Sequence, residues 1–134
     1  MQYIGIGEFG NIYISEDGNT KNAIVFLLNK ESGEVRGALF HPNIGDISLV
    51  YGNDNAGLKK IKDKHPEVID NLQEIIELMQ IQKESENRIK LYSERFFAVV
   101  SKDFCGVKRD AWLLTAFEKK NSVSNNRMDT VETP

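Results

Sequence analysis

The residues of this sequence best suited to chemistry lie at the junction of His65 and Pro66. Proline disfavours helical geometry in the residue before it and suits the first position of a helix, so we expect a helix over Leu58–Lys64 to end there and a second helix to follow. Leu58, Ile61 and His65 are spaced three and four residues apart, which directs the imidazole ring toward the body of the protein.

The protonation state of His65 follows from the same junction. The positive end of the second helix disfavours a charged imidazole, so we expect a neutral ring that is able to accept a proton. The alternative is a partly buried structural histidine that caps a helix, because histidines outside recognised motifs often serve structure.

Positive charge collects around His65 although the chain carries a formal net charge of −3. Four lysines between residues 59 and 64 face a single aspartate in the same segment. Residues 88–118 contain six further basic side chains: Arg88, Lys90, Arg95, Lys102, Lys108 and Arg109. This distribution favours an anion-binding cleft on an acidic protein and argues against a protein that coats nucleic acid through bulk charge. The alternative, for most of these side chains taken singly, is a solvated surface.

The composition indicates one ordinary domain, since 134 residues with 40% hydrophobic side chains are enough to build a core. The single cysteine, Cys105, excludes an internal disulfide and a cysteine-based zinc site. Two histidines in total argue against a structural metal, so no metal or other cofactor is expected. No apolar run is long enough to cross a membrane and the N-terminus lacks a signal-peptide pattern, which favours a cytoplasmic protein or a piece of a larger one.

The sequence of the first fifty residues is typical of strands separated by turns. Short β-prone runs occur at Asn11–Ser15 and Ile47–Tyr51, and the apolar run Ala23–Leu28 favours a buried strand because it is short and partly β-branched. We expect Val35–Phe40 to pair back on Ala23–Leu28 as a hairpin. His41 precedes a turn-forming proline and is expected to be an exposed loop residue.

A second helix is expected after Pro66, because apolar residues recur with helical spacing. Its buried face contains Val68, Ile69, Leu72, Ile75, Ile76 and Met79. Its acidic residues, Glu67 among them, fall on the opposite, solvated face. The polar segment Gln80–Asn87 is interpreted as the helix end and a loop.

Three strands then follow over Arg88–Ser93, Phe96–Ser101 and Ala111–Phe117, with a loop over Lys102–Asp110. They predict an antiparallel meander on which the second helix packs, and therefore an α+β protein. By alternation, Thr115 shares a face with Ala111, Leu113 and Phe117. Its hydroxyl needs a partner, which is either a neighbouring carbonyl or a phosphate bound at the end of the sheet.

Three blocks of sequence, in this order, resemble a known class: Gly45–Gly52, Gly57–Pro66 and Trp112–Glu118. Together they resemble the phage-associated nuclease domains of the barnase/EndoU/colicin/RelE-like (BECR) class over roughly residues 35–118. The resemblance implies helices packed on a curved antiparallel sheet with an N-terminal β-hairpin region. It also implies one nuclease domain over residues 1–120, followed by a loosely ordered tail over residues 121–134.

The resemblance further implies a metal-independent endoribonuclease, toxin-like or phage-derived. Such an enzyme removes the proton of a ribose 2′-hydroxyl, stabilises the attacked phosphate and protonates the leaving 5′-oxygen, which produces a 2′,3′-cyclic phosphate. Carried over by position, it points to His65 and Thr115 as catalytic residues, with Lys60 at a position where relatives often have a second histidine. The expected phosphate-binding residues are Lys64, Arg88, Lys90 and Arg95. Glu118 is a further proton-transfer candidate, although by alternation it points away from Thr115.

Two other classes of function stay open at this point. The first is a catalytically degenerate BECR module that binds RNA or a protein partner. The second is a different enzyme acting on nucleotides or DNA, although the Gly5–Gly10 match to a dinucleotide-binding pattern lacks the strand before it and the helix after it. The expected partners are an RNA substrate and an immunity or antitoxin protein, with no membrane. The expected location is the cytoplasm, or a target cell reached as part of a larger toxin or phage protein.

Overall fold

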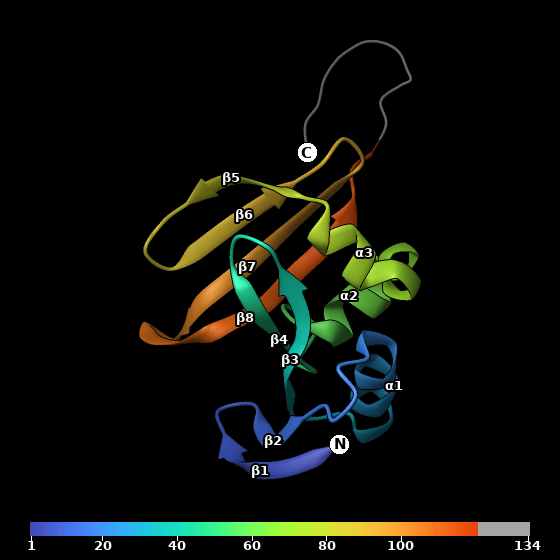
Figure 1. Ribbon diagram of the computed structural model, residues 1–134, viewed down its shortest axis with the longest axis vertical. Helices are drawn as coiled ribbons and strands as arrows, with labels where there is room; N and C mark the ends of the chain where they lie inside the picture. The colour runs from blue at the N-terminus through green and yellow to red at the C-terminus, as the bar shows by residue number, and fades with distance from the viewer. Residues whose placement is uncertain (121–134) are drawn as a thin grey trace.

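The computed structural model describes residues 1–120, and the predicted tail over residues 121–134 lies outside the described residues. The fold is α+β: a mixed eight-stranded sheet with three α-helices and one 3-10 helix (Figure 1). In chain order the elements are β1 (Gln2–Gly7), β2 (Gly10–Ile14), α1 (Thr20–Lys30), β3 (Glu34–His41), β4 (Gly45–Val50), α2 (Leu58–Lys64), η1 (Pro66–Asn71), α3 (Leu72–Glu77), β5 (Gln80–Glu84), β6 (Arg88–Tyr92), β7 (Phe96–Phe104) and β8 (Val107–Glu118).

The sheet has the strand order β1-β2-β3-β4-β8-β7-β6-β5 and consists of two halves. Strands β5 to β8 form the predicted antiparallel meander. In the other half β2 and β3 are parallel, and the halves join where β4 and β8 run parallel at Ser48 and Trp112. The sheet is therefore mixed, which corrects the wholly antiparallel sheet expected from the resemblance.

The segment Ala23–Leu28, predicted as a strand, lies inside helix α1. Asn19 caps the helix, because its side chain accepts a hydrogen bond from the backbone N–H of Asn22 at 3.0 Å. The buried residues Ala23, Ile24 and Leu27 have the spacing of one helical face. The prediction was wrong because two parallel strands need a crossover connection, which α1 supplies between β2 and β3.

The two helices predicted around His65 are present, and α2 spans Leu58–Lys64 as expected. The second predicted helix is divided into the 3-10 helix η1 and the short α-helix α3 at Asn71, whose φ of −127° departs from helical geometry. Val68, Leu72 and Ile76 are nevertheless buried, since a spacing of four residues keeps them on one side of both segments.

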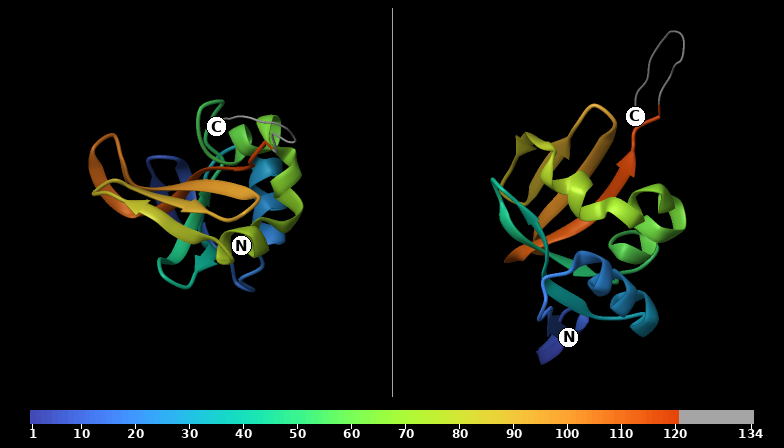
Figure 2. Two further views of the ribbon diagram at one scale, coloured as in Figure 1. Left: turned by 90° about the horizontal axis from the view of Figure 1, so that it is seen from above. Right: turned by 45° about the vertical axis from the view of Figure 1, so that its right-hand side comes forward.

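The core lies between the helices and one face of the sheet, here called the inner face (Figure 2). The meander contributes to it with Ile89, Leu91, Ala98, Val100, Leu113 and Ala116. The side chains between them point to the opposite, outer face: Lys90, Tyr92, Phe97, Val99, Thr115 and Phe117. Each large apolar side chain buried in the core contributes roughly 1.5–3 kcal/mol before the loss of conformational entropy.

Tertiary pairing also overrides two predicted loops. The segment Gln80–Asn87 contains the edge strand β5. Most of its residues are polar, which suits an edge strand whose side chains are exposed. The predicted loop Lys102–Asp110 is mostly strand, and the chain reverses at Cys105 and Gly106 with φ values of 52° and 82°. Two successive positive φ values suit the twist of a two-residue hairpin turn.

The N-terminal glycines Gly7 and Gly10 pair across the hairpin of β1 and β2, so strand β2 and not a helix follows the glycine pattern. His41, expected to be exposed, is 1% exposed. Its Nε2 lies 2.8 Å from the carbonyl oxygen of Met79, and its Nδ1 accepts a hydrogen bond from the backbone N–H of Asn43. His41 is buried because folding brings the end of β3 against the end of α3. These two segments are far apart in the sequence, so the sequence pattern around His41 did not indicate this contact.

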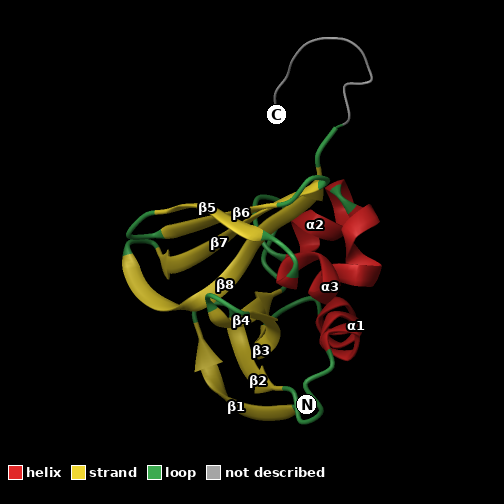
Figure 3. Ribbon diagram, turned by 45° about the horizontal axis from the view of Figure 1, so that its top comes forward, coloured by secondary structure: helices red, strands yellow, loops and turns green. Residues whose placement is uncertain are grey.

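The helices gather on one side of the sheet (Figure 3). Within residues 1–120, no helix is long and apolar enough to cross a membrane.

Candidate functional site

His65 lies at the predicted junction, as the residue between α2 and η1. Its backbone N–H donates to the carbonyl oxygen of Ile61 at 2.7 Å and its own carbonyl accepts from Val68 at 3.2 Å. The imidazole ring packs against Phe117 of the last strand, with 5.1 Å between the two ring centroids. With 30% of the side chain exposed, the ring is anchored by packing and still reachable from solvent.

His65 is held in its neutral form. Partial burial, together with the positive charges of Lys60 and Lys64, lowers its pKa below the ordinary value of 6.5. The Glu67 carboxylate, with Oε2 3.8 Å from Nδ1 of His65, offsets this shift only in part. A neutral imidazole at neutral pH can accept a proton, as the sequence predicted, although burial and not the helix dipole is the main cause.

Thr115 lies on the outer face, in register with Val99 of β7 and through it with Lys90 of β6. A β-bulge precedes it, since the partner of Leu113 is Val100 while that of Thr115 is already Val99. The extra residue breaks the alternation. The prediction that Thr115 and Leu113 share a face was therefore wrong, whereas Thr115 and Phe117 do share one.

The hydroxyl of Thr115 is buried and has no hydrogen-bond partner within residues 1–120. The neighbouring carbonyl that sequence analysis offered as a structural partner is therefore not its partner. A buried polar group without a partner costs about 1–3 kcal/mol, so such groups are rare and are concentrated at sites with a function.

The loop before α2 brings His65 and β8 together. Gly57 has a φ of 91°, and its N–H donates to the carbonyl oxygen of Leu114, the extra residue of the bulge, at 2.9 Å. Gly52 has a φ of 72°, and a Cβ there would lie 2.1 Å from the carbonyl oxygen of Ala56. A side chain at either glycine would strain this tight loop, which sets the distance between α2 and the bulge.

Three of the four lysines of α2 differ in their partners. Lys59 is bound by Asp54 and Asp63, and these hydrogen bonds raise its pKa. Within residues 1–120, neither Lys60 nor Lys64 forms an ion pair. Their separation of four residues places them on one side of α2, and both are close enough to His65 to lower its pKa.

The cations predicted on the meander are not equivalent. Arg88 donates to Asp103 at 2.7 Å and to Ser101 at 3.0 Å, near one end of β6. Arg95 donates to Glu118 at 2.7 and 3.2 Å, in the turn after the other end of β6.

Lys90 lies between these two arginines along β6 and is exposed. Two strand spacings, about 10 Å, separate its Cα from that of Thr115, a distance that a lysine side chain can largely span. The structure therefore groups Lys60 and Lys64 with His65, places Lys90 in register with Thr115, and leaves both arginines paired with carboxylates.

Glu67 is the neighbour of His65 that sequence reasoning missed. A continuous α-helix placed it on the solvated face, but 3-10 geometry turns its carboxylate toward β8, where Oε2 accepts a hydrogen bond from the backbone N–H of Glu118 at 3.2 Å. Its place directly after the His65-Pro66 pair was the available signal. Glu118 pairs with Phe96 and points to the face opposite Thr115, as expected.

Within the described part of the chain, no three histidine, cysteine or acidic side chains are grouped as metal ligands would be. A family model described as "phage-Barnase-EndoU-ColicinE5/D-RelE like nuclease1" matches residues 38–123, well over half of the chain. Neither the curated proteins nor the solved structures contain a significant match.

Proposed function

The chain belongs to this family of phage Barnase-EndoU-ColicinE5/D-RelE-like nucleases, and from that membership we propose that it is a metal-independent endoribonuclease centred on His65. The proposal rests on the partly exposed imidazole of His65, whose pKa is lowered by burial, beside two lysines that form no ion pair within residues 1–120. Next to it, the outer sheet face holds a threonine hydroxyl without a hydrogen-bond partner among the same residues. Each of these groups has a role in cleaving a phosphodiester.

In the proposed reaction His65 accepts the proton of the ribose 2′-hydroxyl. The 2′-oxygen then forms a bond to phosphorus as the bond to the 5′-oxygen breaks, which leaves a 2′,3′-cyclic phosphate and a free 5′-hydroxyl. Lys60, on the side of α2 that faces His65, is proposed to donate the proton that the leaving 5′-oxygen requires. The proton accepted and the proton donated balance.

Negative charge increases on the phosphate oxygens during this step, and fixed positive groups stabilise it. Lys64 and Lys90 supply the positive charge. Thr115 donates a hydrogen bond to the phosphate once bound RNA displaces the side-chain atoms that cover its hydroxyl. We assign Arg88 and Arg95 a weaker part in phosphate binding, because each would have to leave a carboxylate partner.

The proposal extends to the shape of the sheet and to the biological setting, of which the family description names only the phage. We infer a barnase-like curvature of the sheet, with β1 and β2 as its N-terminal hairpin. We also infer a toxin-like or phage-derived role, in the cytoplasm or after delivery into a target cell, with an immunity or antitoxin protein as partner.

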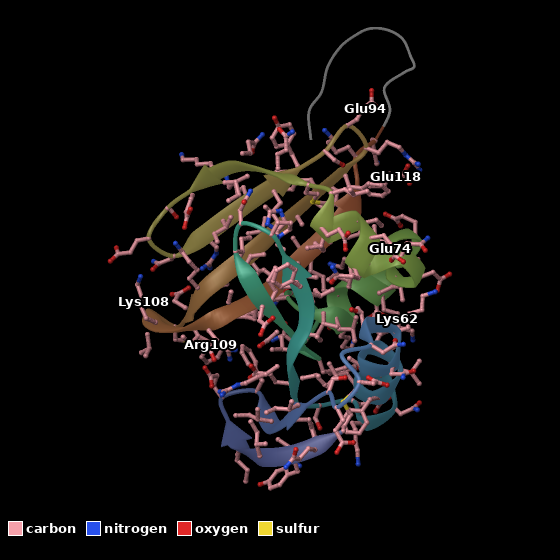
Figure 4. The ribbon with its side chains drawn as sticks, in the orientation of Figure 1. Lys62, Glu74, Glu94, Lys108, Arg109 and Glu118 are labelled. Atoms are coloured by element: carbon pink, nitrogen blue, oxygen red, sulfur yellow. The ribbon has the colours of Figure 1, made fainter. Side chains whose placement is uncertain are left out.

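The test is incubation of the purified protein with total bacterial RNA in EDTA, beside His65→Ala. The exposed Glu74 of α3, which has no part in the proposed reaction, provides the control Glu74→Gln (Figure 4). We expect 2′,3′-cyclic phosphate ends from the parent and from the control but not from His65→Ala.

Equal cleavage by His65→Ala would overturn the assignment of His65, and cleavage lost in EDTA would overturn metal independence. Intact RNA with all three proteins, together with retained RNA binding, would favour the degenerate binding module.

A further inference from the structure

A second site lies near the other end of β8. A pocket of about 330 Å³ is formed between the β1–β2 turn, the α1–β3 turn, the loop over residues 52–56 and β8. Its lining combines aromatic side chains with carboxylates: Phe9, Phe104, Trp112, Glu8 and Glu31. None of these groups has a part in the reaction proposed above.

The aromatic side is a connected set of rings. Phe9 lies 4.7 Å from Trp112 and 4.8 Å from Phe104, measured between ring centroids. Trp112 is 4% exposed and donates its indole N–H to the carbonyl oxygen of Asp103, whereas Phe9 and Phe104 are only partly buried. The guanidinium of Arg109 covers part of the Phe9 ring, with its carbon 5.3 Å from the ring centroid. The remaining surface of Phe9 and Phe104 is apolar and can contact a flat ligand, on a support that Trp112 holds rigid.

The charge of this pocket is opposite to that of the His65 site. Arg109, near the start of β8 (Figure 4), donates two hydrogen bonds to the buried Glu34, and its Nη1 lies 3.3 Å from Oε2 of Glu8. With Glu8 shared with that cation, the carboxylate that remains for a ligand is that of Glu31, which has no ion pair within residues 1–120. A free carboxylate disfavours a phosphate and favours a ligand with N–H donors.

The two sites are adjacent on one surface. Trp112 and Thr115 both point to the outer face, one on each side of the bulge. Their partners on β7, Ser101 and Val99, are two residues apart, which places them about 7 Å apart along the strand. The loop over residues 52–57 borders both, because Gly52 and Ala56 line the pocket while Gly57 is bonded to Leu114 at the bulge. A ligand with a phosphate beside Thr115 can thus extend its other end into the pocket.

We propose that this pocket binds a nucleobase next to the scissile phosphate and selects bases that carry an exocyclic amino group. This inference rests on the proposed function. Guanine, adenine and cytosine present such a donor to a carboxylate. Uracil has no amino group, and its one N–H on this edge lies between two carbonyl oxygens that a carboxylate repels. The partly buried rings of Phe9 and Phe104 supply contacts that every base can use.

The selectivity belongs to the N-terminal part of this chain. Glu8, Phe9 and Glu31, together with Ser32 and Gly33, precede the residues 38–123 that match the family model. This side of the pocket therefore depends on the β1–β2 turn and on the end of α1, which lie outside the matched residues.

Trp112 is the single tryptophan and lines the pocket, so its fluorescence reports binding without any need for cleavage. We would titrate the protein with GMP, AMP, CMP, UMP and inorganic phosphate. The amino-bearing nucleotides should give a saturable change, with UMP about tenfold weaker and phosphate alone without effect, as expected for one hydrogen bond to a charged group. Glu31→Gln should weaken GMP binding by a similar factor, and the matched control Glu74→Gln should leave it unchanged.

UMP binding as tight as GMP binding, or no response to any nucleotide, would overturn the pocket assignment. The nucleotide titration and the RNA cleavage assay, both carried out on the parent, together separate the two proposals. A fluorescence response without RNA cleavage by the parent supports the pocket and contradicts the nuclease, whereas cleavage without a response does the reverse. Circular dichroism of each variant confirms that a lost response reflects the site and not unfolding.

Discussion

The two ends of β8 carry similar residue types in opposite states. Near Phe117, Lys60 and Lys64 form no ion pair with any described residue and lie beside a partly exposed His65. Near the β7–β8 turn, Arg109 is 9% exposed and bound to the fully buried Glu34 (Figure 4). The role of a cation can therefore be assigned only from its partners. The two lysines remain available to a ligand, whereas Arg109 links the N-terminal hairpin to the rest of the sheet.

The energetics of the two ends differ for the same reason. Removing one member of a buried ion pair leaves an uncompensated charge, which is strongly destabilising. Removing an exposed, unpaired lysine changes stability little, because surface charges interact weakly through water. Substitutions at the Phe117 end should therefore change chemistry, and substitutions at the Arg109 end should change folding.

The largest effect is expected at the Phe117 end. His65→Ala should reduce the rate of RNA cleavage by about a hundred- to ten-thousand-fold, the usual contribution of a positioned acid–base group, while thermal unfolding changes little. Cleavage assays with a defined RNA in EDTA and scanning calorimetry measure the two quantities. A variant that loses stability and activity together would show that His65 is structural.

The next effect belongs to the Arg109 end. Arg109→Met should lower the free energy of unfolding by about 3–5 kcal/mol, because Glu34 stays buried and Arg36, at 3.7 Å, does not form a hydrogen bond with it. Urea unfolding measures the loss, and the exposed neighbour Lys108 provides the control Lys108→Met. Equal stability of the two variants would contradict the view that Arg109 fastens the hairpin.

Thr115→Val sharpens the distinction, since stability and activity should change in opposite directions. The valine keeps the shape and removes a buried hydroxyl without a partner, so the free energy of unfolding should rise by about 1 kcal/mol. Cleavage should fall about tenfold if the hydroxyl donates to the phosphate. Unchanged cleavage with increased stability would leave Thr115 without a catalytic part.

The smallest effects are shifts in the pKa of His65. Glu67→Gln removes a charge that raises this pKa and should lower it further, whereas Lys60→Met removes a charge that lowers it and should return it toward 6.5. NMR titration of the His65 ring protons, resolved from those of His41, measures both. Shifts in the same direction would contradict the arrangement around His65.

The lowered pKa also predicts the sign of a pH effect on stability. As the pH falls below 6.5, the unfolded chain binds a proton at His65 before the folded chain does, so folding stability decreases through this interval. His65→Gln should lack that part of the decrease. The measurement is urea unfolding of the parent and of the variant between about pH 7 and pH 5, an interval that contains the ordinary pKa of histidine.

Local signals were enough where one rule decided the structure. The effect of Pro66 on its neighbour located the end of α2 and the junction at His65, and period-2 alternation located β6. They failed where a distant partner decided. Ala23–Leu28 became a helix because β2 and β3 run parallel, and Gln80–Glu84 became a strand because β6 lies beside it.

The sequence by itself determined that the protein is α+β, that a titratable ring stands between two helices, and that positive charge collects around it. Each follows from neighbours within a few positions, through backbone geometry and periodicity. Only the tertiary structure decided which cations are unpaired, that a bulge turns Thr115 to the outer face, and that Glu67 reaches the last strand. These depend on contacts between residues far apart in the chain, and no local pattern encodes them.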